Sequence, residues 1–432
     1  MSLKKIIKKI LPNKVTQNLR LIKLRIQNNA YIKKTRKHYK SVENEIRQRG
    51  GKLRIAAYVP YDASFGGDSL FTLIISKTEL YDAKFVIIPD IVRGRNHSIE
   101  QYEKTKNYFV SKFGQEYVLD GWNSETNEFF DLSDQFDVIY LSNPYDSMVN
   151  GYHSVKYLAT KKVLPIYINY GYSISKWHYS SVEQNNIEMS LFYKYFTDTT
   201  YTQKQVKKYQ IGSGKNTVLS GYAKLDKLLV GTPKTGDKKL KILLSPHHTI
   251  KELNFELQLS NFVTYSDLIL ELPDLFPEVE FIFRPHPMLF VTLVNKGVWT
   301  EKQVSEYIDN LKKKSIEYST GGDYLHIFNE CDAIIHDCGS YMVEWLFTGK
   351  PCCYVVKEEQ YVRKQLDLLG NKALDYHILA ASREDIISFI NQVIKKEIPY
   401  GISDEIKSNI MINYPNVSDF ILKNIYDDIY YK

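Results

Sequence analysis

The sequence predicts an α/β protein made of two Rossmann-like, doubly wound domains facing a crevice, with basic amphipathic helices at the N-terminus. The first observation is length, because 432 residues exceed the roughly 250–300 that one hydrophobic core usually holds. The second is pattern, since short apolar runs alternate with helical stretches in two successive series. The third is a polar stretch over residues 231–240, rich in Gly, Pro and Lys, which is typical of a linker.

β-Branched and aromatic runs predict buried parallel strands in both series. They fall at residues 53–60, 85–89, 137–141 and 164–169, and again at 241–244, 279–283, 332–336 and 352–356. Helical patterns cover residues 265–272 and 340–347. We expect an arm over 1–50, a first domain over 51–230, a linker over 231–240, a second domain over 241–400 and a C-terminal helical segment over 401–432. Two successive doubly wound domains with a crevice between them describe the architecture called GT-B, and pattern alone does not separate it from other paired Rossmann-like folds.

The net charge of +7 is concentrated in one segment. Residues 1–42 hold thirteen Lys or Arg and no Asp or Glu, so the other 390 residues carry 44 basic against 50 acidic side chains. The globular body is therefore acidic overall. This distribution argues against a folded nucleic-acid groove, and we expect no nucleic-acid partner.

The basic arm has an amphipathic pattern. Apolar residues recur among the lysines on both sides of Pro12 and predict two short helices: Ile6, Ile7, Ile10, Val15, Leu19, Ile22 and Ile26. We expect residues 1–42 to lie on an anionic membrane surface as a peripheral anchor. The alternatives are a helix packed on the body and an RNA-binding arm, although aromatic stacking partners are nearly absent before Tyr31. Residues 1–42 show no core pattern, so we expect their removal to leave the fold intact.

No apolar run reaches the ~18–20 residues needed to cross a bilayer, and no signal peptide is evident. The expected location is the cytoplasm, peripheral on the inner face of the membrane. The four cysteines crowd into residues 331–353 without the spacing of a zinc site, so we expect reduced, partly buried thiols. No carboxylate pair suggests an obligatory metal, and we expect neither a metal nor an obligatory cofactor.

In the first domain, a glycine turn follows the first expected strand. Gly66, Gly67 and Asp68 would open a helix, as in the first βα unit of a nucleotide-binding fold. The turn lacks the glycine spacing of a dinucleotide-binding loop. The alternative is that its glycines serve only to let the loop approach the acceptor or the other domain.

In the second domain, polar residues follow three expected strands. The first strand runs into His247 and His248, the next into Arg284 and His286, and the third into 337–340. Ligands of open parallel sheets bind beyond the carboxyl ends of the strands, so these residues should share one site. Arg284 has the planar fork that suits phosphate, and His286 is held between two prolines. Because His247 and His248 are adjacent, only one is expected to face the crevice.

The third strand end resembles an anion site. Gly339 permits a tight turn, Ser340 can cap the helix that follows, and its N-terminus would bind a donor diphosphate. Gly349 would end this helix. Glu344 would accept hydrogen bonds from ribose hydroxyls, or it would be a solvated carboxylate. Asp337 would contact the donor, or it would brace the loop.

The second-domain motifs, together with residues 221–226, resemble the CDP-glycerol glycerophosphotransferase family, which includes teichoic acid primases and polymerases. The likeness covers roughly residues 137–360. The family's Arg-x-His-Pro element is matched by Arg284, His286 and Pro287, and its Asp-Tyr-Ser-Ser run loosely by residues 337–340. The resemblance implies a GT-B fold, a CDP-activated donor, membrane association and a role in surface-polymer synthesis.

The first-domain motif departs from the family. Where the family has Trp-His-Gly-Thr-Pro, this chain has Asn169, Tyr170 and Gly171 followed by Tyr-Ser. Tyr170 thus replaces the family's presumed base, and a phenol of normal pKa is a poor base at neutral pH. Either another group, such as His178 or His247, takes the proton, or the reaction differs. Asn169 and Gly171 are expected on the acceptor side with Gly66, Gly67 and Asp68.

We therefore expect a transferase that moves a CDP-activated polyol phosphate to a lipid-linked or oligosaccharide acceptor, extending a bacterial surface polymer such as teichoic acid or capsule. The first alternative is a GT-B glycosyltransferase that uses a nucleotide sugar. The second is a non-catalytic scaffold of a polymer-assembly complex. The catalytic candidates are His286, His247, His248 and Tyr170; the donor candidates are Arg284, Asp337, Gly339, Ser340 and Glu344. Acceptor, linkage and oligomeric state remain open.

Overall fold

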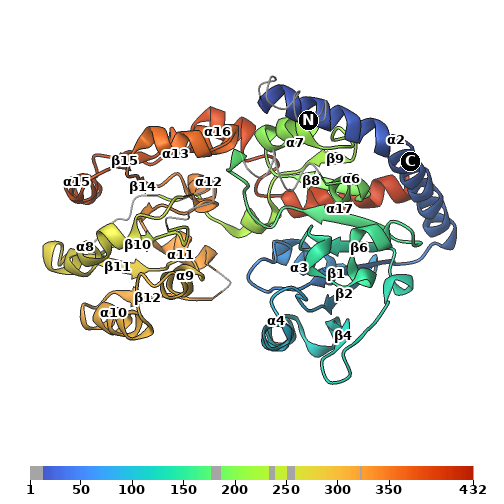
Figure 1. The fold of residues 1–432 in the computed structure, drawn as a ribbon, viewed down its shortest axis with the longest axis horizontal. Helices are drawn as coiled ribbons and strands as arrows, with labels where there is room; N and C mark the ends of the chain where they lie inside the picture. Colours follow the sequence, from blue (N-terminus) through green and yellow to red (C-terminus); the bar gives the residue numbers. More distant parts are fainter. Residues whose placement is uncertain (1–12, 177–185, 233–238, 251–257, 322–323, 432) are drawn as a thin grey trace, which may run out of the picture. The chain divides into compact units, whose positions relative to one another are not determined.

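A computed structural model describes residues 13–176, 186–232, 239–250, 258–321 and 324–431 (Figure 1). The chain divides into two compact units. The first comprises Met1–Gly171, His178–Asp226 and Ile412–Lys432, and the second Tyr172–Trp177 and Lys227–Met411. The chain enters the second unit at Lys227, four residues before the expected linker at 231–240. It returns to the first unit at Ile412, within the expected C-terminal segment at 401–432.

The first unit is built on a seven-stranded parallel sheet in the order β3-β2-β1-β6-β7-β8-β9. Strand β1 pairs with β2 on one side (Leu53 with Tyr81) and with β6 on the other (Ile55 with Val138). The chain therefore adds strands outward on one side of β1 and then starts again on the other side. The strands are β1 Leu53–Val59, β2 Tyr81–Ile87, β3 Val118–Asp120, β6 Val138–Leu141, β7 Leu164–Ile168, β8 Lys194–Thr197 and β9 Thr217–Leu219. A small antiparallel pair joins β4 Trp122–Asn123 to β5 Glu128–Phe129.

Helices cover this sheet and return to it from the far end of the chain. They are α3 Asp68–Ser76, α4 Arg95–Phe113, α5 Val155–Leu158, α6 Glu188–Leu191, α7 Thr200–Tyr209 and α17 Val417–Tyr430. Short 3-10 turns lie at Gln115–Tyr117, Ser133–Gln135, Asp146–Met148, Gly151–His153 and Ala223–Lys227. Asp226 accepts the backbone N–H groups of Val417 (3.0 Å) and Ser418 (2.8 Å), which anchors the start of α17 to this unit (Figure 1).

The N-terminal arm forms one 37-residue helix, α2 Asn13–Arg49, after residues 1–12, which lie outside the described part. Its second half belongs to the core: Val42 and Ile46 are buried, and Tyr39 donates a hydrogen bond to the Leu191 carbonyl (2.5 Å). The expectation that residues 1–42 contribute nothing to the core is therefore wrong. Basic composition concealed it, because only every third or fourth residue of the helix faces the unit.

The second unit repeats the doubly wound design with six parallel strands in the order β12-β11-β10-β13-β14-β15. The strands are β10 Leu240–Ser245, β11 Val279–Phe283, β12 Glu317–Tyr318, β13 Ala333–His336, β14 Cys352–Val355 and β15 Ile378–Ala380. The helices are α8 Phe262–Leu275, α9 Leu289–Asn295, α10 Glu301–Lys313, α11 Leu325–Glu330, α12 Tyr341–Glu344, α13 Glu359–Gln365, α14 Leu368–Leu374, α15 Arg383–Ile394 and α16 Asp404–Asn409, with a 3-10 turn at Trp345–Thr348.

Two parallel Rossmann-like sheets confirm the predicted fold class. All eight expected strands are present, whereas seven short strands were not predicted: β3, β4, β5, β8, β9, β12 and β15. The cysteines are free, as expected, and buried. Among the described residues, none of the helices is both long and apolar enough to span a membrane.

Candidate functional site

Three strand ends meet at one edge of the second sheet, as the sequence predicts. β11, β10 and β13 are neighbours and parallel, and the strand order reverses between β10 and β13. The loops are tied together: Ser245 Oγ donates to the Arg284 carbonyl (2.7 Å), and the His286 N–H donates to the Pro246 carbonyl (2.9 Å). The reversal point of an open sheet is where ligands usually bind.

All three candidate histidines gather at this edge. The ring centroids of His247 and His248 lie 4.5 Å apart, those of His248 and His286 4.2 Å, and those of His247 and His286 5.1 Å. His247 and His248 therefore both join the cluster, contrary to the expectation that adjacent residues would point apart. His247 Nδ1 is hydrogen-bonded to Thr249 Oγ1 (2.8 Å), which orients the ring.

Two histidines of the cluster, His247 and His286, are held in the neutral state. Burial, followed by repulsion from His248, lowers the pKa of His286 to about 3, and burial lowers the pKa of His247 well below its usual value. Three imidazolium ions could not share this space. At neutral pH, His247 and His286 each carry one N–H donor and one lone pair.

Neutral imidazoles can bind either a metal or an anion. One nitrogen from each of the three rings lies within 4.8 Å of the others, which is close enough to hold a metal ion. However, His286 Nδ1 accepts the Met288 N–H (3.1 Å), so the neutral ring carries its proton on Nε2. That tautomer presents a donor rather than a lone pair, and it favours an anion.

Asp337 braces the loops of this edge. It is buried, and its two carboxylate oxygens accept the N–H groups of His247 and Asn261, each at 2.5 Å. Burial raises the pKa of Asp337 to about 7, although both hydrogen bonds favour the ionised form. Of the two roles expected for Asp337, the geometry fits the bracing one.

Arg284 is buried and already has protein partners. Its guanidinium donates to Ser319 Oγ (2.9 Å), to the Gly321 carbonyl and to the Tyr341 hydroxyl (3.4 Å). These bonds use three of its five N–H groups. At most two remain for a phosphate, so much of the side chain's role is to hold the segment after β12.

The segment after β13 differs from the expected anion site. Ser340 makes no side-chain cap, and α12 is only a four-residue helix followed by a 3-10 turn, which Gly349 ends in the left-handed conformation. Glu344 is 1% exposed and accepts a hydrogen bond from Tyr324. It is neither solvated nor open to a ribose, which corrects both expectations. Tyr324, 20 residues earlier in the chain, covers this carboxylate, and spacing alone did not reveal the pairing.

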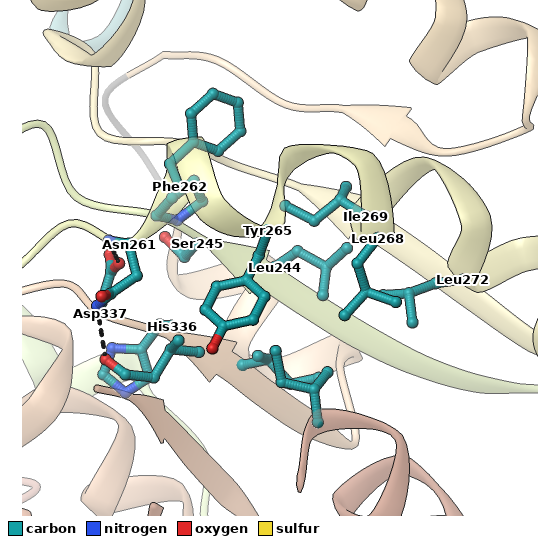
Figure 2. A pocket seen from close by; sticks show the side chains of 14 residues that line it. Leu244, Ser245, Asn261, Phe262, Tyr265, Leu268, Ile269, Leu272, His336 and Asp337 are labelled. Carbon is teal, nitrogen blue, oxygen red and sulfur yellow. Dashed lines mark hydrogen bonds between the residues drawn. The ribbon is translucent and has the colours of Figure 1, made fainter. Parts of the chain in front are cut away.

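A cavity of about 40 Å³ lies beneath α8, next to this edge (Figure 2). Asp337 and Asn261 form its polar end, and Leu268 and Leu272 lie toward the other (Figure 2). Ligand pockets usually measure about 300–1,000 Å³. This cavity is therefore a packing void under the site and not the donor pocket.

In the first unit, the glycine turn opens α3 as predicted. A Cβ on Gly67 would come within 2.8 Å of Phe65 and 2.9 Å of Tyr140, so only glycine fits. A Cβ on Gly66 would lie 3.2 Å from the Asn169 carbonyl oxygen, which shows that the two expected acceptor-side loops touch. Asp68, however, pairs with Lys112 (2.8 Å).

Hydrogen bonds hold the segment after β7 in place. Asn169 is buried and donates to Asp198 Oδ2 (2.7 Å), and the Tyr222 hydroxyl donates to the Tyr170 carbonyl (2.8 Å). The Tyr170 hydroxyl lies 3.4 Å from that of Tyr145. Gly171 ends the segment within the first unit. His178, the other candidate base, lies outside the described residues.

Two supporting residues were missed. Thr249 directly follows the two histidines, and a hydroxyl in that position is a recognisable partner for an imidazole. Asn261 lies 76 positions before Asp337, and no local pattern in the sequence indicates that pairing.

The chain matches no protein-family model and no curated protein. Among solved structures, it is similar to a variant of the wall teichoic acid polymerase TagF soaked with CDPG, with TM-score 0.59, 10% identity and coverage of 97% of this chain and 99% of that one. It is also similar to a UDP-N-acetylglucosamine 2-epimerase (0.54, 12%, 88% and 96%) and to the UDP-GlcNAc 2-epimerase from Neisseria meningitidis bound to UDP-GlcNAc (0.52, 13%, 87% and 100%). These likenesses establish the fold, which is GT-B.

Proposed function

We propose that this protein is a transferase that moves a CDP-activated polyol phosphate, similar to CDP-glycerol, onto a lipid-linked acceptor of a bacterial surface polymer. The observation that carries the proposal is the cluster of His247, His248 and His286 at the reversal point of the second sheet. The Arg-x-His-Pro resemblance and the similarity to the TagF polymerase over 97% of the chain support it.

The reaction would be an in-line displacement at phosphorus. An acceptor hydroxyl attacks the distal phosphorus of the donor, a new P–O bond forms, and the bond to the bridging oxygen breaks. The nucleoside monophosphate leaves with the bonding electrons, and the hydroxyl proton passes to a base. Positioning and neutralisation of charge supply most of the rate in such reactions.

Each imidazole has a role in this scheme. His286 and His247, both neutral, donate N–H groups to the phosphate oxygens, where donors already in place stabilise developing charge. The ring centroid of His248 lies 4.2–4.5 Å from those of the other two, and His248 is our candidate for the base. Asp337 positions His247, and Arg284 positions the segment after β12 while offering its remaining N–H groups.

We further propose that the protein works peripherally on the inner face of the membrane. The support is the basic helix α2, on which Leu19, Ile22 and Ile26 are 53%, 51% and 74% exposed. Three apolar side chains at helical spacing among lysines suit the headgroup layer.

A nucleotide-sugar enzyme is the second candidate. The observation that favours it is the similarity to UDP-GlcNAc 2-epimerases, one of them bound to UDP-GlcNAc. A diphosphate site at the histidine cluster would serve either donor, because both carry the same phosphate groups.

Incubation of the purified chain with CDP-glycerol and a lipid-linked acceptor tests the proposal. A phosphodiester signal in the ³¹P NMR spectrum of the product, together with release of CMP, would support it. His326→Ala is a matched control, because His326 is exposed in the same unit, and only the cluster variants should lose product. Turnover of UDP-GlcNAc alone, with CDP-glycerol inert, would select the second candidate.

A further inference from the structure

A second pocket lies between α2 and the segment that follows α7. Its cavity measures about 220 Å³. The residues that line it are Arg25, Ile26, Asn29, Ile32, Lys33 and Arg36 of α2, with Ile211, Gly212, Ser213 and Lys215 of the segment. All of them belong to the first unit, so the pocket is separate from the histidine cluster.

The lining is strongly cationic. Arg25, Lys33, Arg36 and Lys215 contribute four positive charges, and none of the lining residues is acidic. Arg25 has protein partners, because its guanidinium donates to the carbonyls of Lys208 (2.8 Å) and Gln210 (3.1 Å) and thereby holds the segment against α2. The side chains of Lys33, Arg36 and Lys215 have no ion-pair partner among the residues that the structure describes, so these three cations can face a ligand.

Arg36 is the most informative of them. Its Nη2 is buried, and no acceptor for it exists among the residues that the structure describes. Burial lowers the pKa of Arg36, since desolvation disfavours its charge. A buried polar atom without a partner is costly, and in native proteins such an atom calls for an explanation, such as a bound water or ion. A guanidinium fork is best suited to phosphate or carboxylate oxygens.

An apolar stripe borders the pocket. Leu19, Ile22 and Ile26 are more than half exposed, and Ile26 is also part of the pocket lining. A ligand that combines a phosphate with apolar chains would therefore touch both features. Free phosphate would use only the pocket.

We propose that this pocket binds the phosphate of an anionic membrane phospholipid, with Arg36, Lys33 and Lys215 around the phosphate and the stripe in the adjoining acyl boundary. This inference rests on the membrane placement in the proposed function. It adds a defined headgroup site to the diffuse attraction of a basic arm, and one of its residues, Lys215, lies far outside that arm.

Vesicle binding by full-length variants tests the site. Arg36→Gln is compared with Lys37→Gln, which removes the same charge from the next residue of α2, an exposed one outside the pocket. Diffuse attraction is worth about 1 kcal/mol per basic residue, so Lys37→Gln should weaken binding to phosphatidylglycerol vesicles about fivefold. Arg36→Gln should weaken it at least ~10-fold further, since a charged hydrogen bond is lost as well. Equal losses in the two variants would overturn the proposal.

Soluble ligands distinguish the source of the phosphate. Glycerol 3-phosphate and inorganic phosphate should raise the Tm of the wild-type protein at millimolar concentration, and they should not raise that of Arg36→Gln. If inorganic phosphate bound as tightly as the vesicles, the ligand would be a free anion and the lipid assignment would be wrong.

Stability separates a binding role from a structural one. Without ligand, Arg36→Gln should unfold at the same temperature as wild type or higher, because it removes a half-buried guanidinium whose Nη2 has no acceptor among the described residues. A lower Tm would mean that Arg36 holds the fold, and would count against the site. Transfer from CDP-glycerol to a soluble acceptor, measured without vesicles, should be unchanged in Arg36→Gln. If the wild-type protein showed no transfer from CDP-glycerol, that result would refute the proposed reaction and not the lipid site.

Discussion

Asp337→Asn tests whether burial or hydrogen bonding controls the pKa of Asp337, the residue that braces the loops beneath the histidine cluster. Burial raises the pKa of Asp337 from 3.8 to about 7, although two backbone N–H groups favour the ionised carboxylate. Between these pH values the folded state binds more protons than the unfolded state. Stability contributed by this group is therefore present at low pH and lost as pH rises from about 4 to 7.

The size of the effect follows from the shift. A shift of about three pKa units corresponds to about 4 kcal/mol at most. Asparagine cannot ionise, so the free energy of unfolding of wild type minus that of Asp337→Asn should fall across this range. A second cost does not depend on pH: the amide NH₂ faces a buried N–H, which costs about 1–3 kcal/mol.

The assay is thermal unfolding of both proteins from pH 4.5 to 8. The difference between them is needed because His286 and His377 act in the opposite direction. Burial lowers their pKa values to about 3 and about 4, so their contribution to stability is lost as pH falls below about 6.5. If the free energy of unfolding of wild type minus that of Asp337→Asn stayed flat or rose with pH, the hydrogen bonds would outweigh burial. Asp337 would then be an ordinary ionised carboxylate.

His286→Ala should lower kcat by about 10²–10³-fold with a small change in Tm, whereas the exposed control His326→Ala should change neither; near-normal turnover would make His286 structural. Arg284→Ala should lower the Tm more than His286→Ala, by leaving Ser319 and Gly321 without their donor, and equal Tm values would contradict the bracing role. A chelator should leave turnover unchanged, because the neutral His286 ring presents an N–H donor and not a lone pair to the cluster. Turnover that requires a metal would reassign the cluster as a metal centre.

The sequence was informative where structure follows from local pattern. Continuous apolar runs located the central strands such as β11, because buried parallel strands need them. Edge strands of two or three residues, such as β12, carry too little pattern to be recognised. The polar strand ends were found because topology brings the carboxyl ends of parallel strands together.

Side-chain partners were beyond reach because they depend on packing between distant segments. Arg284 suits phosphate by its chemistry, yet it meets Ser319 and Gly321 in the structure. Glu344 follows a polar turn, yet Tyr324 covers it. The core role of Val42 was likewise concealed by the charged residues around it in α2.

The most direct test of the central claim is a calorimetric titration of the purified chain with CDP, UDP and GDP, repeated with His286→Ala. We expect CDP to bind most tightly, and His286→Ala to bind it at least ~10-fold more weakly while staying folded. Binding of CDP that is absent, or unchanged in His286→Ala, would show that the histidine cluster is not the donor site.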